Sequence, residues 1–359
     1  MLIQSAIDFN LDVWILDPDE NAPCKHIATN FQQGSLKDFD TVYEFGKQCD
    51  LLTIEIESVN TAALKKLQEE GIKVYPEPQI IELIQDKREQ KTFYKEHNIP
   101  TADFVLTENR EDVRKNISML PAVHKLGREG YDGRGVQKIT TSDELEKAFD
   151  APGLLEKLID FDKELAVIVA RNEQGEMKTF PATEMVFHPE HNLVEYLFAP
   201  ADISEQIARD ADELAKKVIA QLSMTGLLAV EMFLTKESKL LVNEVAPRTH
   251  NSGHHSIEAN VTSQFEQHLR AILNLPLGDT ATKIPAAMVN LLGEDGFTGL
   301  ARLEGLEETL AIEGAKVHLY GKKLTKPFRK MGHVTIIDQN ISRLKEKVQK
   351  VKQTLKIKA

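Results

Sequence analysis

Two apolar segments, each carrying one acidic side chain, constrain the fold of this chain more than any other feature. Segment 227–235 contains Glu231, and the segment that follows after only three residues contains Glu244. Apolar runs of this length, joined by so short a connection, predict a β-hairpin. In that hairpin Glu231 would lie opposite Asn243 or Glu244, on one face of the sheet.

The two opposed carboxylates predict a metal site. Directly opposed side chains on one face lie about 4.5–5.5 Å apart at Cβ, where like charges repel. A hard cation with oxygen ligands relieves this repulsion, and Mg²⁺ is commonly held by one or two carboxylates together with substrate phosphates. The alternative is a pair of solvated acids on an exposed face. The apolar residues that flank Glu231 and Glu244 favour the metal site.

The length and net charge of the chain exclude some classes of protein. With 359 residues the chain is too long for one core, so two or three domains are expected. The net charge of -12 disfavours nucleic acid and anionic membranes as partners. No apolar run is long enough to span a bilayer. Cys24 and Cys49 are the only cysteines, and they suit a reducing cytoplasm, although two thiols can also pair.

The pattern along the chain predicts three parts. Alternating strands and helices over 1–98 predict a parallel α/β domain, with strands at 13–16, 51–54 and 71–75, a helix over 60–70 and one continuous helix over 80–97. The part over 99–275 is expected to be largely antiparallel, with strands at 122–126, 136–139, 154–158, 164–171, 178–181 and 193–199 and a helix over 203–222 before the hairpin. The part over 276–359 is expected to be a small β-rich domain closed by an amphipathic helix over 341–355.

A loop with four glycines, residues 125–135, lies between two of these strands. Glycine lets backbone N–H groups approach a phosphate closely, so the loop is able to fold over a nucleotide as a flap. It lacks the Gly-Lys-Ser/Thr end of a Walker A loop, and no helix follows it as in a dinucleotide fingerprint. Lys125 would add a point charge for phosphate. Plain turn chemistry is the alternative, and the downstream acidic hairpin favours the flap.

A strand and the acids near it are candidates for nucleoside recognition. Backbone groups of 156–159 are able to read the edge of adenine, while Glu164 would accept hydrogen bonds from ribose hydroxyls. A charged strand edge is the alternative. Glu55 and Glu57 follow the strand at 51–54, where ligands gather in parallel sheets, although helix capping or solvation is the simpler interpretation of both.

A small planar anion would suit the side chains that follow the acidic hairpin. Arg248 offers a guanidinium fork, and His250 and Asn251 add hydrogen-bond donors beside it. The neighbouring His254 and His255 raise zinc as an alternative. The segment has no cysteine and no His-Glu-x-x-His spacing, which disfavours zinc.

Three sequence motifs indicate a particular protein family. They are Gly130-Tyr-Asp-Gly-Arg-Gly135, Asn243-Glu-Val-Ala-Pro-Arg248 with His250-Asn-Ser-Gly-His254, and Arg329-Lys-Met-Gly-His333. Through them, most of the chain resembles the N5-carboxyaminoimidazole ribonucleotide synthetases, a family of ATP-grasp enzymes in purine biosynthesis. The resemblance implies an α/β and α+β multidomain protein, with a pre-ATP-grasp domain over 1–98, an ATP-grasp domain over 99–275 and a C-terminal domain over 276–359.

The resemblance also implies a reaction. ATP, bicarbonate and 5-aminoimidazole ribonucleotide would give N5-carboxyaminoimidazole ribonucleotide, ADP and phosphate, with carboxyphosphate as the intermediate. Mg²⁺, or Mn²⁺ in its place, would be the metal, and the enzyme would be a cytoplasmic homodimer. Two alternatives stay open: another ATP-grasp ligase, such as a formate-dependent glycinamide ribonucleotide transformylase, and a nucleotide-binding protein without turnover.

Roles for individual residues are carried over from the family by position. Mg²⁺ would bind Glu231 and Glu244, and the ATP phosphates would contact Lys87 and Lys125. The remaining ATP contacts would come from Gly130, Tyr131, Asp132, Gly133, Arg134, Gly135, Val136, Glu156, Lys157, Leu158, Ile159, Glu164, Asn243 and Glu244. Bicarbonate and carboxyphosphate would be held by Arg248, His250 and Asn251. The aminoimidazole ribonucleotide would be surrounded by Tyr131, Asp132, Arg134, Lys322, Arg329 and Lys330, among which Asp132, Arg134 and Lys322 would be catalytic.

The start of the chain departs from the family pattern. Family members begin with a strand and a glycine-rich turn before the first helix, whereas Met1 already lies in that helix. A parallel sheet without its leading strand exposes an edge, and helix N-termini bind phosphate. The chain as written is therefore expected to be less stable, and to bind aminoimidazole ribonucleotide more weakly, than one with these elements. Phe187 and His188 stand where the family usually has a nucleotide-contacting histidine, and their role stays open.

Overall fold

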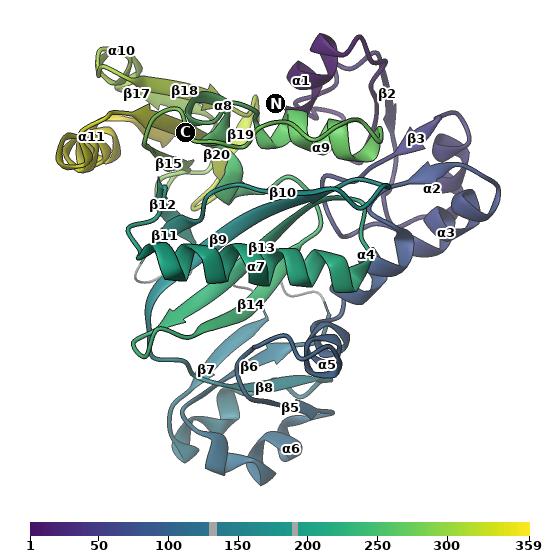
Figure 1. The fold of residues 1–359 in the computed structure, drawn as a ribbon, viewed down its shortest axis with the longest axis vertical. Helices are drawn as coiled ribbons and strands as arrows, with labels where there is room; N and C mark the ends of the chain where they lie inside the picture. Colours follow the sequence, from purple (N-terminus) through teal and green to yellow (C-terminus); the bar gives the residue numbers. More distant parts are fainter. Residues whose placement is uncertain (129–134, 189–192) are drawn as a thin grey trace.

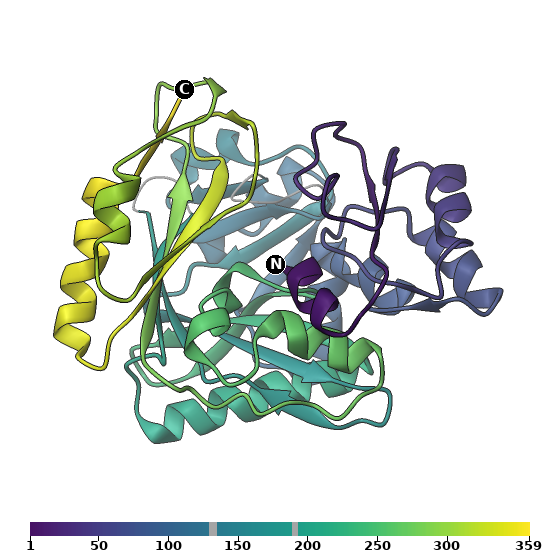
Figure 2. The same ribbon diagram turned by 90° about the horizontal axis from the view of Figure 1, so that it is seen from above.

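A nine-stranded sheet occupies the centre of the molecule, and a four-stranded sheet lies below it in the view of Figure 1. The computed structural model describes residues 1–128, 135–188 and 193–359. Seen from above, the N-terminal and C-terminal parts lie on opposite sides of the molecule (Figure 2). Within the described residues, no helix is both long and apolar enough to cross a membrane.

The N-terminal part alternates strands and helices, as predicted. Its elements are α1 (Leu2–Asp8), β1 (Trp14–Asp17), β2 (Asn30–Gln33), α2 (Phe39–Gly46), β3 (Leu51–Leu52), α3 (Thr61–Glu69), β4 (Lys73–Val74) and α4 (Pro78–Ile84). Strand β1 pairs with β2 and β3 pairs with β4, both in parallel. Leu64, Leu67 and Ile81 are buried in the core of this part. The sequence patterns did not predict β2 and α2.

The prediction of one continuous helix over 80–97 is wrong. The segment forms α4 and a second helix, α5 (Lys87–Glu96), because Asp86 adopts an extended backbone and its carboxylate accepts a hydrogen bond from the Arg88 amide at 3.0 Å. Such an N-cap begins a helix and cannot lie inside one. The Lys87 amide donates to the Gly127 carbonyl at 2.7 Å. The break therefore fixes Lys87 at the first turn of α5, beside the glycine loop.

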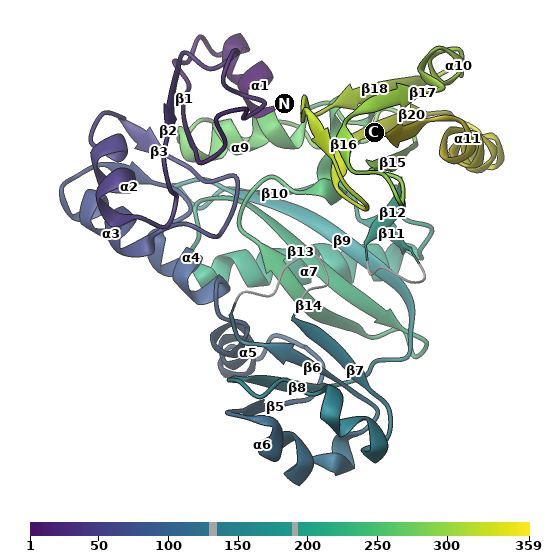
Figure 3. The same ribbon diagram turned by 180° about the vertical axis from the view of Figure 1, so that it is seen from behind.

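The small sheet follows α5 and is antiparallel throughout, with the strand order β5-β8-β6-β7 (Figure 3). It is surrounded by short helices and packs around Val113, Ile139 and Leu155, which are fully buried. Its elements are β5 (Phe104–Thr107), α6 (Arg110–Lys115), η1 (Ile117–Met119), β6 (Ala122–Leu126), β7 (Val136–Ile139), η2 (Ser142–Lys147) and β8 (Gly153–Lys157).

The large sheet crosses the expected boundary near residue 275. Its order is β14-β13-β9-β11-β12-β15-β20-β18, with β10 paired to β9. Strand β12 pairs with β15, so that Tyr196 lies opposite Val289. The strands are β9 (Phe161–Arg171), β10 (Met177–Thr179), β11 (Thr183–Phe187), β12 (Val194–Ala199), β13 (Gly226–Thr235), β14 (Leu240–Ala246), β15 (Ala286–Leu292), β18 (Ala315–Leu319) and β20 (Lys330–Ile337). The C-terminal strands therefore extend the central sheet.

Helices cover both faces of this sheet. Because side chains alternate along a strand, Val167 and Val169 of β9 pack beneath α7 (Glu205–Leu222), whereas Ile168 and Ala170 belong to a second cluster with Ala271 of α9 (Gln264–Ile272). The remaining elements are η3 (Asn251–Gly253), α8 (Ser256–Ala259), β16 (Gly299–Leu300), β17 (Arg302–Glu304), α10 (Leu306–Leu310), β19 (Leu324–Thr325), α11 (Ile341–Thr354) and β21 (Lys356–Lys358). Helix α11 is the predicted closing helix.

Candidate active site

The predicted acidic hairpin forms, and of the two partners left open for Glu231 the structure selects Glu244. Glu231 of β13 lies directly opposite Glu244 of β14. The register shifts immediately afterwards, because Met232 pairs with Val242. Asn243 is therefore the extra residue of a β-bulge, in which two residues of one strand oppose a single residue of its partner.

A third carboxylate joins this pair from the neighbouring strand. Glu231 is paired with Ala166 of β9, and Phe233 is paired with Glu164. Residues two apart on a strand share a face, so Glu164 and Glu231 are diagonal neighbours on the same face of the sheet. Three adjacent strands thus present three acids, Glu164, Glu231 and Glu244.

Burial and mutual repulsion raise the pKa of two of these acids. Burial, followed by the neighbouring Glu244 carboxylate, raises the pKa of Glu164 to about 7. Burial also raises the pKa of Glu231, and Glu244 and Glu164 raise it further. A divalent cation fits this place because it would favour the ionised form of both groups. Within the described ranges, no group of three His, Cys, Asp or Glu residues is arranged to hold a metal by itself.

Two lysines from the other side of the site contact the hairpin. Lys87 Nζ at the start of α5 lies 2.7 Å from Glu244 Oε2. Lys125 Nζ on β6 lies 3.2 Å from Asn243 Oδ1 and 3.1 Å from Glu156 Oε1. The charge of Lys87 is the main reason why the pKa of Glu244 is lowered. The structure therefore brings the predicted phosphate lysines to the predicted metal residues.

Sequence reasoning missed Lys91. Its Nζ lies 2.6 Å from Glu156 Oε2, and both side chains are almost completely buried. Burial lowers the pKa of Lys91 to about 8, against the opposing effect of Glu156. One feature of the sequence could have identified Lys91: it follows Lys87 by four residues, and residues i and i+4 share one face of a helix.

Arg248 and Glu57 form an ion pair that links the hairpin loop to the N-terminal part. Arg248 Nε lies 2.8 Å from Glu57 Oε1. Glu55 lies nearby: burial raises its pKa, while the charges of Arg248 and Lys322 oppose that rise. The two acids left open by the sequence thus face the candidate anion and substrate residues.

His250 and Asn251 are held by neighbouring polar side chains. His250 Nε2 lies 3.5 Å from Glu231 Oε1, and its Nδ1 lies 2.9 Å from the Ser252 hydroxyl. The amide of Asn251 exchanges two hydrogen bonds, at 2.8 and 3.0 Å, with the amide of Asn290 on β15. His250 is therefore oriented toward the metal residues, and Asn251 toward the C-terminal strands. Asn290 is a further residue that sequence reasoning missed.

The predicted substrate residues of the C-terminal part lie on and before β20. Lys322 Nζ donates to the carbonyl of Lys330 at 2.8 Å and lies 5.6 Å from the centre of the Tyr320 ring. Arg329 donates to the carbonyl of Leu324 at 2.6 Å. These contacts place Lys322 next to Lys330, and the charge of Lys330 also acts on Glu231.

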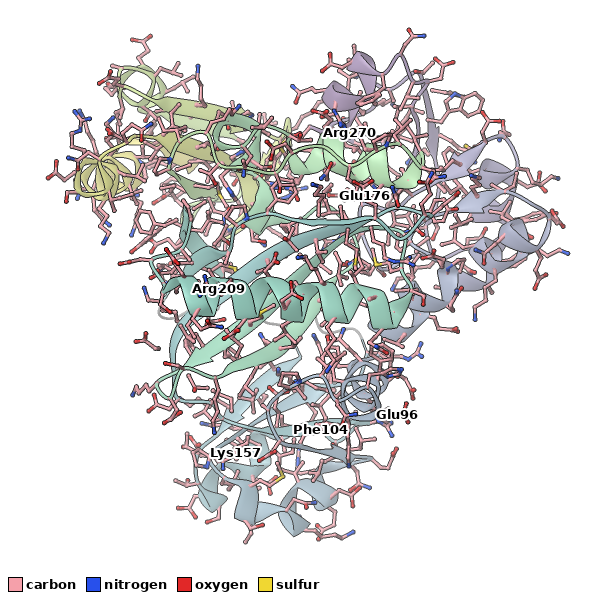
Figure 4. All side chains as sticks on the ribbon, viewed as in Figure 1. Glu96, Phe104, Lys157, Glu176, Arg209 and Arg270 are labelled. Carbon is pink, nitrogen blue, oxygen red and sulfur yellow. The ribbon has the colours of Figure 1, made fainter. Side chains whose placement is uncertain are left out.

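The remaining predicted residues belong to the flap and to the end of β8. Gly130, Tyr131, Asp132, Gly133 and Arg134 lie outside the described residues. Gly135 precedes β7, which begins at Val136. Lys157 is exposed at the end of β8 on the small sheet, and Leu158 and Ile159 follow it, half-buried (Figure 4).

A large sheet with paired carboxylates, facing a small sheet that carries lysines, defines an ATP-grasp protein. Family models agree, because they match a ribonucleotide synthetase preATP-grasp domain over 1–85, an ATP-grasp domain over 92–265 and a phosphoribosylaminoimidazole carboxylase C-terminal domain over 286–347. The chain is 37% identical over 344 residues to the N5-carboxyaminoimidazole ribonucleotide synthase of Synechococcus elongatus, which covers 94% of this chain and 86% of that protein. The chain belongs to the N5-carboxyaminoimidazole ribonucleotide synthase family, and the resemblance seen in its motifs is confirmed.

Other relatives agree in sequence and in structure. The chloroplastic phosphoribosylaminoimidazole carboxylase of Vigna aconitifolia is 38% identical over 353 residues, which are 95% of this chain but 62% of that protein. The crystal structure of the Thermotoga maritima synthetase superposes with a TM-score of 0.93 at 42% identity, covering 100% of this chain and 96% of that one. An Aspergillus clavatus synthase in complex with ADP and 5-aminoimidazole ribonucleotide gives 0.89 at 33% identity, covering 99% and 94%.

Proposed function

We propose that this protein carboxylates 5-aminoimidazole ribonucleotide with bicarbonate and ATP, giving N5-carboxyaminoimidazole ribonucleotide, ADP and phosphate in purine biosynthesis. The observation that carries the proposal is the direct opposition of Glu231 and Glu244, with Lys87 and Lys125 beside them. Membership of the synthase family supports the choice of substrates. The Aspergillus clavatus relative was crystallised with ADP and 5-aminoimidazole ribonucleotide.

Each side of the site has its own task. Lys87 and Lys125 bind the ATP phosphates beneath the flap at 130–136, while the backbone of 156–159 and the Glu164 carboxylate hold adenine and ribose. Mg²⁺, or Mn²⁺ in its place, binds Glu231 and Glu244. When bound, the ion supplies the positive charge that phosphoryl transfer requires.

The reaction has two steps. A bicarbonate oxygen attacks the γ-phosphorus, the bond to the ADP oxygen breaks, and carboxyphosphate and ADP form. The amine of the aminoimidazole then attacks the carbonyl carbon, loses a proton and expels phosphate. Arg248, His250 and Asn251 orient bicarbonate and carboxyphosphate by charge and hydrogen bonding. Because carboxyphosphate reacts with water, a closing flap over the site protects it. The aminoimidazole ribonucleotide is held by Tyr131, Asp132, Arg134, Lys322, Arg329 and Lys330.

The proposal extends to assembly and organisation. The protein acts as a cytoplasmic homodimer, as the family resemblance implies. Its chain divides into domains at 98/99 and 275/276, with the large sheet continuing across the second boundary. Its partners are ATP, bicarbonate and the aminoimidazole ribonucleotide, without nucleic acid or membrane. Light scattering of the purified protein tests the dimer directly.

An ADP-release assay tests the reaction. ADP release from ATP and Mg²⁺ should require both 5-aminoimidazole ribonucleotide and bicarbonate. Release that depends on formate and glycinamide ribonucleotide would instead identify a transformylase. ATP binding by calorimetry, without ADP release above background under any of these conditions, would identify a nucleotide-binding protein without turnover. Either result overturns the proposal.

A further inference from the structure

Lys91 lies inside the charge network of the ATP site but has no role in the proposed reaction. Its Nζ lies 2.6 Å from Glu156 Oε2, while Lys125 Nζ lies 3.1 Å from the other oxygen, Oε1. Lys91 is 2% exposed and Glu156 is 3% exposed. One buried carboxylate is thus shared between two lysines.

The ammonium of Lys91 is enclosed behind Glu156. The ring of Tyr94 lies 5.8 Å from its Nζ, and the hydroxyl of Thr101 accepts a hydrogen bond from it. Thr101 in turn donates to the carbonyl of Val242 at 2.7 Å, directly before the bulge. Lys91 therefore joins α5, the small sheet and β14 from the rear, where a nucleotide phosphate would not reach it.

Nucleotide binding changes the partners of the other two lysines. When Lys87 and Lys125 turn to the phosphates, as the proposed function requires, they leave Glu244 and Glu156. Glu244 would then be held by the metal ion in place of Lys87. The ligand offers no cation to replace Lys125 at Glu156, and a buried carboxylate that loses its partner is strongly unfavourable.

We propose that Lys91 is a positioning residue for ATP binding, because it keeps the Glu156 carboxylate neutralised when Lys125 leaves it for the phosphates. Lys91 stays paired with the Glu156 carboxylate, so Lys125 is able to leave that carboxylate and bind the phosphates. Without Lys91, Glu156 would retain Lys125 and compete with the nucleotide for it. The inference rests on the ATP-binding part of the proposed function and is independent of the second substrate.

A double-mutant cycle tests this coupling. Lys91→Met removes the charge but keeps an unbranched apolar side chain, and Glu156→Gln removes the competing carboxylate while leaving the backbone of β8 unchanged. Calorimetric titration with ATP and Mg²⁺ should show that Lys91→Met weakens binding at least tenfold in the natural background. In the Glu156→Gln background, the same substitution should weaken binding less than threefold. Lys95→Met, at an exposed position on the same helix, is the matched control and should leave the affinity unchanged.

Thermal unfolding without ATP shows whether Lys91 positions groups for ATP binding or only stabilises the fold. A Lys91→Met variant that unfolds at a lower temperature but binds ATP within twofold of the natural protein would overturn the proposal. Equal losses of affinity in the two backgrounds would also overturn it. If Lys91→Met fails to fold, the comparison of Glu156→Gln with the double variant decides, and a loss of more than threefold there refutes the coupling.

The proposed reaction is tested separately in the same preparation. Natural protein that binds ATP but shows no ADP release dependent on bicarbonate refutes the carboxylation and leaves the Lys91 test valid. Natural protein that does not bind ATP refutes both.

Discussion

The two walls of the proposed ATP site carry opposite charge. The wall formed by the large sheet presents acids from three adjacent strands, Glu164, Glu231 and Glu244. The wall formed by α5 and the small sheet presents two lysines, Lys87 and Lys125, and the buried pair of Glu156 and Lys91 lies beside Lys125. A magnesium–nucleotide complex has the complementary arrangement, because its cation suits the acidic wall and its phosphates suit the basic one.

Because the two walls carry opposite charge, they attract each other in the ligand-free protein. The contact of Lys87 with Glu244 joins them at 2.7 Å. In the proposed function these two groups would part, because Lys87 would contact phosphate and Glu244 would bind the metal. Substitutions on each wall separate the contributions of the two walls.

The largest effect is expected on the acidic wall. Glu231→Gln and Glu244→Gln should each reduce ADP release about 100-fold or more, since a metal ion supplies several kcal/mol of charge stabilisation. Steady-state rates with ATP, bicarbonate and aminoimidazole ribonucleotide measure this. Glu237→Gln, at an exposed position in the turn of the same hairpin, should not alter the rate. Natural rates in both site variants would show that the acidic wall holds no catalytic metal.

On the basic wall, Lys87→Met and Lys125→Met should each weaken ATP binding about 10- to 100-fold, because each removes a charged hydrogen bond to phosphate. Calorimetric titration provides the dissociation constants. Lys138→Met, on an exposed position of β7, is the control. If the lysine variants lose turnover but keep ATP affinity, the division of tasks between the two walls is wrong.

A smaller and more selective effect is expected for residues assigned to neither wall. Asp132→Asn and Lys322→Ala should raise the apparent KM for aminoimidazole ribonucleotide about tenfold through lost hydrogen bonds, with ATP affinity unchanged. Substrate kinetics and ATP titration of the same preparations compare the two. An equal loss of ATP affinity in Asp132→Asn would show that this residue serves ATP rather than the aminoimidazole ribonucleotide.

The smallest effect is a pH dependence of stability. The raised pKa of Glu164, about 7, means that the folded protein binds more protons than the unfolded chain between about pH 5 and pH 7. This group therefore destabilises the ligand-free fold as pH rises through that window. Burial lowers the pKa of His255 and His268, and these groups have the opposite effect.

The measurement for this prediction is the difference in Tm between Glu164→Gln and the natural protein, since both contain the same histidines. Glu164→Gln should gain about 2 °C relative to the natural protein between pH 5 and pH 7.5. Mg²⁺ and ATP should remove most of this gain by favouring the ionised carboxylates of the natural protein. A difference in Tm that does not change with pH would contradict the raised pKa of Glu164.

Local patterns predicted the acidic wall better than the basic one. A connection of three residues nearly fixes the register of a hairpin, so the sequence limited the partner of Glu231 to Asn243 or Glu244. The β-bulge that selects Glu244 could not be predicted from the local pattern. Lys91 lies in a strongly charged helix, where a lysine is ordinarily solvated, and only the packing of the small sheet against α5 buries it. The break at Asp86 was missed because its capping interaction is hidden within a run of charged residues.

Contacts between segments far apart in the sequence also could not be predicted. The patterns located β12 and β15, but the pairing of Tyr196 with Val289 joins residues far apart along the chain. Hydrophobic periodicity describes each strand alone and gives no information about its partner. The continuity of the large sheet into the C-terminal part could therefore not be predicted from the sequence.

The bulge at Asn243 adds a residue that the core packing of β14 does not require. Val242 and Val245 both pack into the core on the α7 side, and a regular strand would place a single residue between two core positions of this kind. Here there are two, and both Asn243 and Glu244 contact lysines of the opposite wall. Deletion of Asn243 would leave the alternation of β14 intact, so the fold of this strand does not require the extra residue, which adds a contact to Lys125 of the opposite wall. Across homologous chains, its presence or absence would be a clearer marker of function than the identity of its side chain.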